Sequence, residues 1–146
     1  MSKRTRNFWI ELVILVLLTA AGITAFSISA MSPLSRDDLR TQAGDLRSFA
    51  AAGRLLAIQY SRGETTEKFF RNQTELLQDK ASAEENSLRS AKTKPGLDSQ
   101  LDELGSLASE VSSGLNEMHD GSNADSSASR LEMLTHQLSA QEDRLK

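Results

Sequence analysis

Three arginines, Arg54, Arg62 and Arg71, are the residues of this 146-residue chain best suited to hold a charged ligand. They lie in or near a stretch that contains most of the aromatic residues outside the first thirty positions. A guanidinium group can grip a carboxylate through two parallel hydrogen bonds, so arginines gathered at one place in a helical sensor domain would bind a carboxylate ligand. The competing interpretation is that each arginine forms an ion pair on the protein surface.

Residues suited to catalysis or metal binding are sparse. His119 and His136 are the only histidines and have no second ligand at a recurring helical spacing, and the chain contains no cysteine. Glu84 and Glu85 are adjacent acids, but neighbours on a helix point to different sides, so we interpret them as part of a solvated face. Neither a glycine-rich phosphate loop nor a nucleophile elbow occurs. The sequence therefore predicts no catalytic residues, no metal site, no cofactor and no enzymatic activity.

An apolar run over residues 8–30, FWIELVILVLLTAAGITAFSISA, is the strongest pattern in the chain. As a helix it spans about 34 Å, which matches a bilayer hydrocarbon core of about 30 Å with modest tilt. A cleavable signal peptide is the alternative, but its apolar region is usually about 7–15 residues long. We therefore predict an uncleaved signal anchor that forms a single transmembrane helix over 8–30.

Three residues of this run are candidate contacts within the bilayer. Glu11, the only charged residue of the run, lies about one turn from its start, where the carboxylate can reach the headgroups. The alternative for Glu11 is a contact with a partner helix. Ala21 and Ala25, followed by Ser29, form a line of small residues at four-residue spacing, which would let a second transmembrane helix approach closely.

The charges beside the run predict its orientation. Lys3, Arg4 and Arg6 lie in a tail, residues 1–7, that has no acidic residue, whereas the other flank mixes arginines with aspartates. This distribution favours a cytoplasmic N-terminus and places residues 31–146 in the periplasm or outside the cell. The expected location is a bacterial-type inner (plasma) membrane, crossed once.

Residues 31–146 are predicted to be all-α. They contain 17 leucines and 12 alanines but one isoleucine and one valine, so the residues that favour strands are nearly absent. Ser35 with Asp38 resembles a capping box, Pro95 with Gly96 predicts a sharp turn, and Gly63 marks a break. The expected fold is a single N-terminal transmembrane helix followed by an antiparallel helical hairpin or, as we favour, a four-helix bundle. The expected helices cover about 35–60, 64–93, 97–118 and 127–145.

Leucine-rich seams indicate how the helices pack and where a partner would bind. The third expected helix carries apolar residues at alternating spacings of four and three, the average expected in a left-handed bundle. The core is thin, with four aromatic residues in 116, so we expect a protein partner or self-association through exposed seams. The net charge of about −5 over this segment disfavours nucleic acid. The candidate partner interface consists of Leu97, Leu101, Leu104, Val111, Leu115 and Met118.

The layout of basic tail, anchor helix and antiparallel helical domain resembles the four-helix-bundle sensor ectodomains of bacterial chemoreceptors. That resemblance implies ligand sensing by a system in which the output domain is supplied elsewhere. The layout also resembles the inner-membrane spanins of phages, which are envelope-spanning adaptors. The leading hypothesis is a membrane-anchored helical interaction or scaffold protein that binds a partner or itself outside the cytoplasm, with ligand sensing and a spanin-like adaptor as the alternatives.

Overall fold

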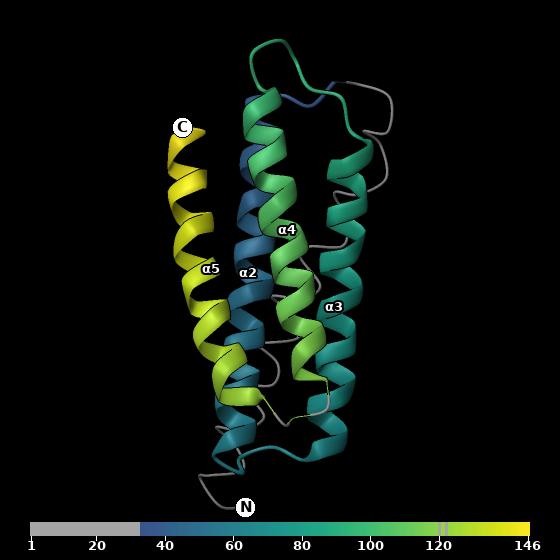
Figure 1. The fold of residues 1–146 in the computed structure, drawn as a ribbon, viewed down its shortest axis with the longest axis vertical. Coiled ribbons are helices and arrows are strands. Elements are labelled where there is room, and N and C mark those ends of the chain that lie inside the picture. The colour runs from purple at the N-terminus through teal and green to yellow at the C-terminus, as the bar shows by residue number, and fades with distance from the viewer. Residues whose placement is uncertain (1–32, 120, 122) are drawn as a thin grey trace, which may run out of the picture. The chain divides into compact units, whose positions relative to one another are not determined.

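The computed structural model describes residues 33–119, 121 and 123–146 of the chain. Four helices make up one compact unit over Pro33–Lys146. They are α2 (Arg36–Ser61), α3 (Glu67–Ser90), α4 (Asp98–Met118) and α5 (Ala124–Arg144) (Figure 1). No helix within the described residues is both long and apolar enough to cross a bilayer, and the predicted span at 8–30 lies outside them. The all-α fold of the described residues is therefore confirmed, and it is a four-helix bundle.

The first helix begins at the capping box that the sequence predicts. The Asp38 carboxylate accepts a hydrogen bond from the Ser35 backbone N–H at 2.8 Å, and the Asp38 N–H donates to the Ser35 hydroxyl at 3.3 Å. These bonds satisfy two N–H groups that have no partner within the helix. At the other end the chain leaves α2 through Gly63, whose φ of 69° is a conformation that other residues rarely adopt. The break at Gly63 is therefore fixed by backbone geometry.

The last helix starts earlier than its turn-forming sequence suggests. Residues 120–127 are rich in Asp, Ser, Asn and Gly, yet α5 begins at Ala124. Ala124, Ser127 and Ala128 are buried against the other helices, and the Ser127 N–H donates to the Asn123 carbonyl at 2.9 Å. Burial of these small side chains outweighs the weak preference of serine and aspartate for turns.

The helices alternate in direction and form two closely packed pairs. Helix α2 packs most extensively on α5, and α3 packs most extensively on α4 (Figure 1). Within the described residues α2 also touches α4 across the bundle, whereas α3 and α5 do not touch. The cross-section is therefore flattened, with α2 and α4 close together at its centre.

Leucine and alanine side chains fill the space between the four helices. Phe70 is the only fully buried aromatic residue among those described, and it stacks on Tyr60 with ring centroids 4.2 Å apart. Because most of the core side chains are leucines or alanines, the helices lie close together rather than around a wide apolar interior. The fully buried side chains include Leu39, Leu46, Leu88, Leu104, Leu115, Met118, Leu131, Leu134, Leu138 and Leu145.

A glycine permits the contact across the bundle. A Cβ atom at Gly53 of α2 would lie 2.5 Å from a methyl group of Leu115 on α4 and 3.0 Å from a methyl group of Leu131 on α5. Gly114 of α4 packs on the same Leu131 side chain, and a Cβ there would lie 3.3 Å from it. Three helices therefore meet at Leu131, and the absence of a side chain at Gly53 sets how closely they approach.

Two glycine substitutions in α2 are expected to change stability in opposite directions. Gly53→Ala should lower the free energy of unfolding by up to about 2 kcal/mol, because overpacking costs about 1–3 kcal/mol and helix propensity returns about 1 kcal/mol. Gly44→Ala is the matched control, since a Cβ there meets nothing within 4 Å, and it should stabilise by about 0.5–1 kcal/mol. Chemical denaturation of both variants tests this, and equal effects would contradict the close approach at Gly53.

Candidate functional site

A buried carboxyl group on α3 is the most unusual polar feature of the bundle. Glu84 falls on the buried face of α3, one turn after Ala81 and one turn before Leu88, and it is only 5% exposed. Its Oε2 atom is buried and has no hydrogen-bond partner. A carboxylate in such surroundings loses its hydration without gaining donors, so its charged form is disfavoured.

Asp45 on α2 is the neighbouring acid across the α2–α3 boundary. Burial raises the pKa of Glu84 to about 7 from an ordinary value of 4.5, and the negative charge of Asp45 adds to this shift. Burial also raises the pKa of Asp45. Two carboxyl groups that approach one another in a poorly solvated place do not both ionise readily, so this pair holds a proton near neutral pH.

Basic residues near Glu84 do not neutralise it in the described structure. On α3, Glu85 pairs with Arg89 at 2.6 Å, and Lys80 forms no salt bridge within the described residues. On α4, Glu103 and Glu117 pair with arginines of α5 rather than facing α3. Glu84 therefore forms no salt bridge with any described residue, and the negative charge of Asp45 acts on it.

The chemistry open to this pair is the uptake and release of a proton. A protonated carboxyl group has one O–H to donate, whereas an ionised one can only accept. Among the described residues, no group of three or more histidine or acidic side chains is arranged to hold a metal ion. Glu84 and Asp45 form the candidate functional site, and we refer to them as the acid pair.

The leucine seam that was the candidate partner interface lies inside the bundle. Leu101 is partly buried, and the other five residues belong to the hydrophobic core. These side chains pack the chain's own helices together, because each helix of an antiparallel bundle turns its apolar stripe inward. A partner that bound them would have to displace one of the chain's helices. The buried members are Leu97, Leu104, Val111, Leu115 and Met118.

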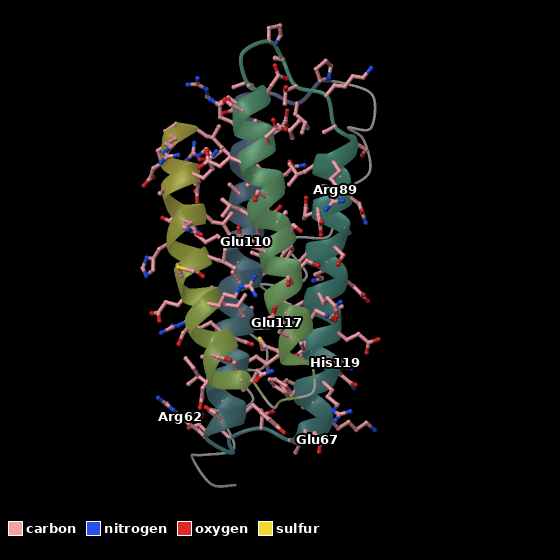
Figure 2. All side chains as sticks on the ribbon, in the orientation of Figure 1. Arg62, Glu67, Arg89, Glu110, Glu117 and His119 are labelled. Carbon is pink, nitrogen blue, oxygen red and sulfur yellow. The ribbon has the colours of Figure 1, made fainter. Side chains whose placement is uncertain are left out.

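The three candidate arginines occupy separate places. Arg54 on α2 pairs with Glu132 of α5 at 3.0 Å, and Arg71 pairs with Glu67 within α3 at 2.8 Å. Arg62 ends α2 and is exposed at the end of the bundle that also holds Glu67 (Figure 2). Arg54 and Arg71 are therefore each held by a different glutamate, one on α5 and one on α3, as the interpretation of surface ion pairs predicts.

The remaining candidates lie at the surface or outside the described residues. His119 follows the end of α4 (Figure 2), His136 lies in α5, and both are exposed. Glu11, Ala21 and Ala25 lie outside the residues that the structure describes.

The interpretation of Glu84 as part of a solvated face is wrong. Glu84 is buried, because it occupies a seam position seven residues after Leu77, which is also buried. The signal in the sequence was this position in the apolar repeat, since a charged residue at a core position is seldom fully solvated. The acidic neighbour from α2 could not be found this way, because pairing between helices is not encoded in the repeat of either one.

Substitution of Glu84 by glutamine is expected to change how stability depends on pH. Because the folded pKa lies above the unfolded one, the folded state binds more protons between pH 4.5 and about 7, and the free energy of unfolding of the wild type falls as pH rises through that window. Glu84→Gln removes this fall. The variant should gain on the order of 2 kcal/mol at pH 8, or about 5–10 °C in Tm, with little gain at pH 4.5.

The neighbouring substitution Glu85→Gln is the matched control. Glu85 is a less buried acid in an ion pair within α3, so its loss should leave the pH dependence of Tm in place. Thermal unfolding at pH 4.5, 6 and 8 measures both variants. A wild-type Tm that does not fall above pH 4.5, or a fall that Glu84→Gln retains, would show that Glu84 is not the titrating group.

Comparisons of the chain with protein families, with curated proteins and with solved structures found no match.

Proposed function

We propose that this chain is a single-pass, membrane-anchored helical protein whose bundle lies outside the cytoplasm and binds a protein partner or a second copy of itself. The proposal rests on the short distance along the chain between the apolar run and the bundle. The run ends at Ala30, and Leu34 is already a buried residue of the bundle. A helical domain that begins so soon after an apolar run of membrane-spanning length is typical of a domain held at a membrane surface.

The start of the bundle is fixed to the turn between α3 and α4. The Leu34 N–H donates to the Lys92 carbonyl at 2.7 Å, and the Lys94 N–H donates to the Leu34 carbonyl at 3.1 Å. These two bonds tie residue 34 to a segment almost 60 positions away. A force or displacement applied to the N-terminal end of the bundle therefore reaches the α3–α4 turn directly, which suits a domain held by its N-terminus.

A partner would bind the outer faces of the helices, because the leucine seams are internal. Three large apolar side chains stand exposed among the described residues: Leu55 on α2, Leu76 on α3 and Met133 on α5, each between 41% and 53% exposed. Covering such side chains removes apolar area from water at about 25 cal/mol per Å². These positions are where a partner protein or a second copy would gain most from contact.

The anchor is tested by charging the centre of the apolar run. In alkaline carbonate extraction the full chain should stay with the membrane fraction. The double variant Leu15→Arg, Leu18→Arg should move to the soluble fraction, because each arginine at the centre of a membrane helix costs about 2.5–3.5 kcal/mol of insertion. Leu15→Ile, Leu18→Ile is the matched control. Extraction of the wild type by carbonate would contradict the anchor.

The partner interface is tested by gentle detergent extraction, affinity purification and mass spectrometry of the full chain. A stoichiometric partner, or a homo-oligomer, should be recovered with the wild type and reduced at least about tenfold by Leu55→Asp, Leu76→Asp or Met133→Asp. Each variant should keep a Tm within a few degrees of the wild type, because all three residues are exposed. Ser106→Asp on the exposed face of α4 is the control. Recovery of a monomer without a partner would contradict the proposal.

A further inference from the structure

The acid pair lies at the boundary between the two helix pairs. Asp45 belongs to α2, which packs mainly on α5, and Glu84 belongs to α3, which packs mainly on α4. Closing the bundle brings the α3–α4 pair against the α2–α5 pair, and in the closed bundle the negative charge of Asp45 acts on Glu84. Repulsion between Asp45 and Glu84 therefore opposes the packing of one helix pair on the other. It leaves the packing within each helix pair largely unchanged.

The connections between the helix pairs differ at the two ends of the bundle. The α2–α3 turn and the α4–α5 turn lie at one end, where the chain is continuous, and each contains a glycine with positive φ: Gly63 at 69° and Gly121 at 75° (Figure 1). At the opposite end the covalent connection runs only within the α3–α4 pair. There the two backbone hydrogen bonds of Leu34 hold the helix pairs together. We call the first end, where the chain joins the two helix pairs, the hinge end, and the second end, where hydrogen bonds of Leu34 join them, the latch.

The acid pair lies on the latch side of the bundle. Asp45 is in the first half of α2, which starts at the latch, and Glu84 is near the end of α3, which finishes there. Repulsion between two groups exerts a larger opening torque on the helix pairs when the groups lie far from the hinge end. Repulsion at this position therefore acts first on the backbone contact of Leu34. This contact is the only isolated β-bridge among the described residues.

We propose that the bundle is a proton-controlled clasp: with a proton on Glu84 the α3–α4 pair closes against the α2–α5 pair, and loss of that proton opens the bundle at the Leu34 end. In the closed form a proton on Glu84 removes its electrostatic repulsion with Asp45. In the open form water reaches the ionised Glu84, whose Oε2 atom has no donor in the closed bundle. This inference does not depend on the membrane anchor or on a partner.

The size of the effect follows from the change in proton affinity on opening. The pKa of Glu84 is about 7 in the closed bundle and returns toward its ordinary value of 4.5 once water reaches the group. The ratio of closed to open molecules therefore falls by up to about 300-fold as pH rises from below 4.5 to above 7.

The charge of Asp45 on α2 favours this direction, because it raises the proton affinity of Glu84. On α3, Glu85 and Arg89 form a salt bridge with each other, and Lys80 forms no salt bridge within the described residues. On α4, Glu103 and Glu117 pair with α5. The half-buried Glu110 of α4 lies level with Glu84, because Gln78 bonds to Asn116 and Ser82 to Ser112.

Spin-label distance measurement on the full chain in detergent tests the clasp. The chain contains no cysteine, so Asn86→Cys on α3 and Ala140→Cys on α5 give two unique labels, one on each helix pair and both exposed near the latch. At pH 5.5 we expect one narrow distance distribution. At pH 8.5 a second, longer distance should appear, with its population rising as the pH increases from 5.5 and levelling off above about 7.

Variants of the acid pair decide whether Glu84 is responsible. Glu84→Gln should keep the short distance at both pH values, and Glu84→Met, which also lacks the charge, serves if the glutamine variant does not fold. Asp45→Asn should move the midpoint to lower pH, because it removes the charge that opposes ionisation of Glu84. Glu85→Gln should behave as the wild type. An unchanged wild-type distance between pH 5.5 and 8.5, or the same lengthening in Glu84→Gln, overturns the proposal.

Discussion

The close approach of α2 to α4 is the constraint on which the rest of the bundle depends. It requires Gly53 to have no side chain beneath Leu115 and Leu131, and it brings the centres of the two helix pairs into contact. A core built from leucines, alanines and glycines leaves little free volume for water. A polar atom inside it is therefore satisfied only when another protein group bonds to it. Glu84 is the most acute case, because its position on the buried face leaves Oε2 without a donor.

The last helix is held in register by charges at its edges. Arg130 and Arg144 of α5 pair with Glu117 and Glu103 of α4, at 2.8 and 3.0 Å, and Glu110 lies midway between these two acids on the same face (Figure 2). On the other edge α5 pairs with Arg47 and Arg54 of α2. Each exposed ion pair contributes only about 0–1 kcal/mol, so the apolar seams supply most of the stability. A shift of α5 by one turn along the bundle is disfavoured, because it would separate the partners of these ion pairs.

The two ends of the bundle differ in how the helix pairs are joined. The end with Gly63 and Gly121 keeps the helix pairs joined, while the end with Leu34 holds them by two backbone hydrogen bonds. A domain held at a membrane by its N-terminus would therefore be held at the end that opens. In such an arrangement the proton on Glu84, the Leu34 contact and a partner bound to the outer faces act on the same closure, so each would shift the equilibrium of the others.

The helical class and the main breaks can be predicted from the sequence, which also contains the apolar run over 8–30. These follow from local physics: leucine and alanine without β-branched residues favour helices, Ser35 with Asp38 caps one, and Pro95 and Gly96 lie in the turn between α3 and α4. The helical start at Ala124 needed the tertiary structure, because burial of Ala124 and Ala128 overrode a turn-forming sequence.

The pairing of the helices and the polar residues that come together depend on tertiary packing. The repeat that marks Leu104 and Val111 as apolar is the same whether they face another protein or the chain's own helices, and packing placed them inside. The meeting of Glu84 with Asp45 depends on the register between α2 and α3, almost 40 residues apart in sequence. A periodic pattern fixes the side of a helix on which a residue lies, but the facing residue is chosen by packing against another helix, which no local pattern contains.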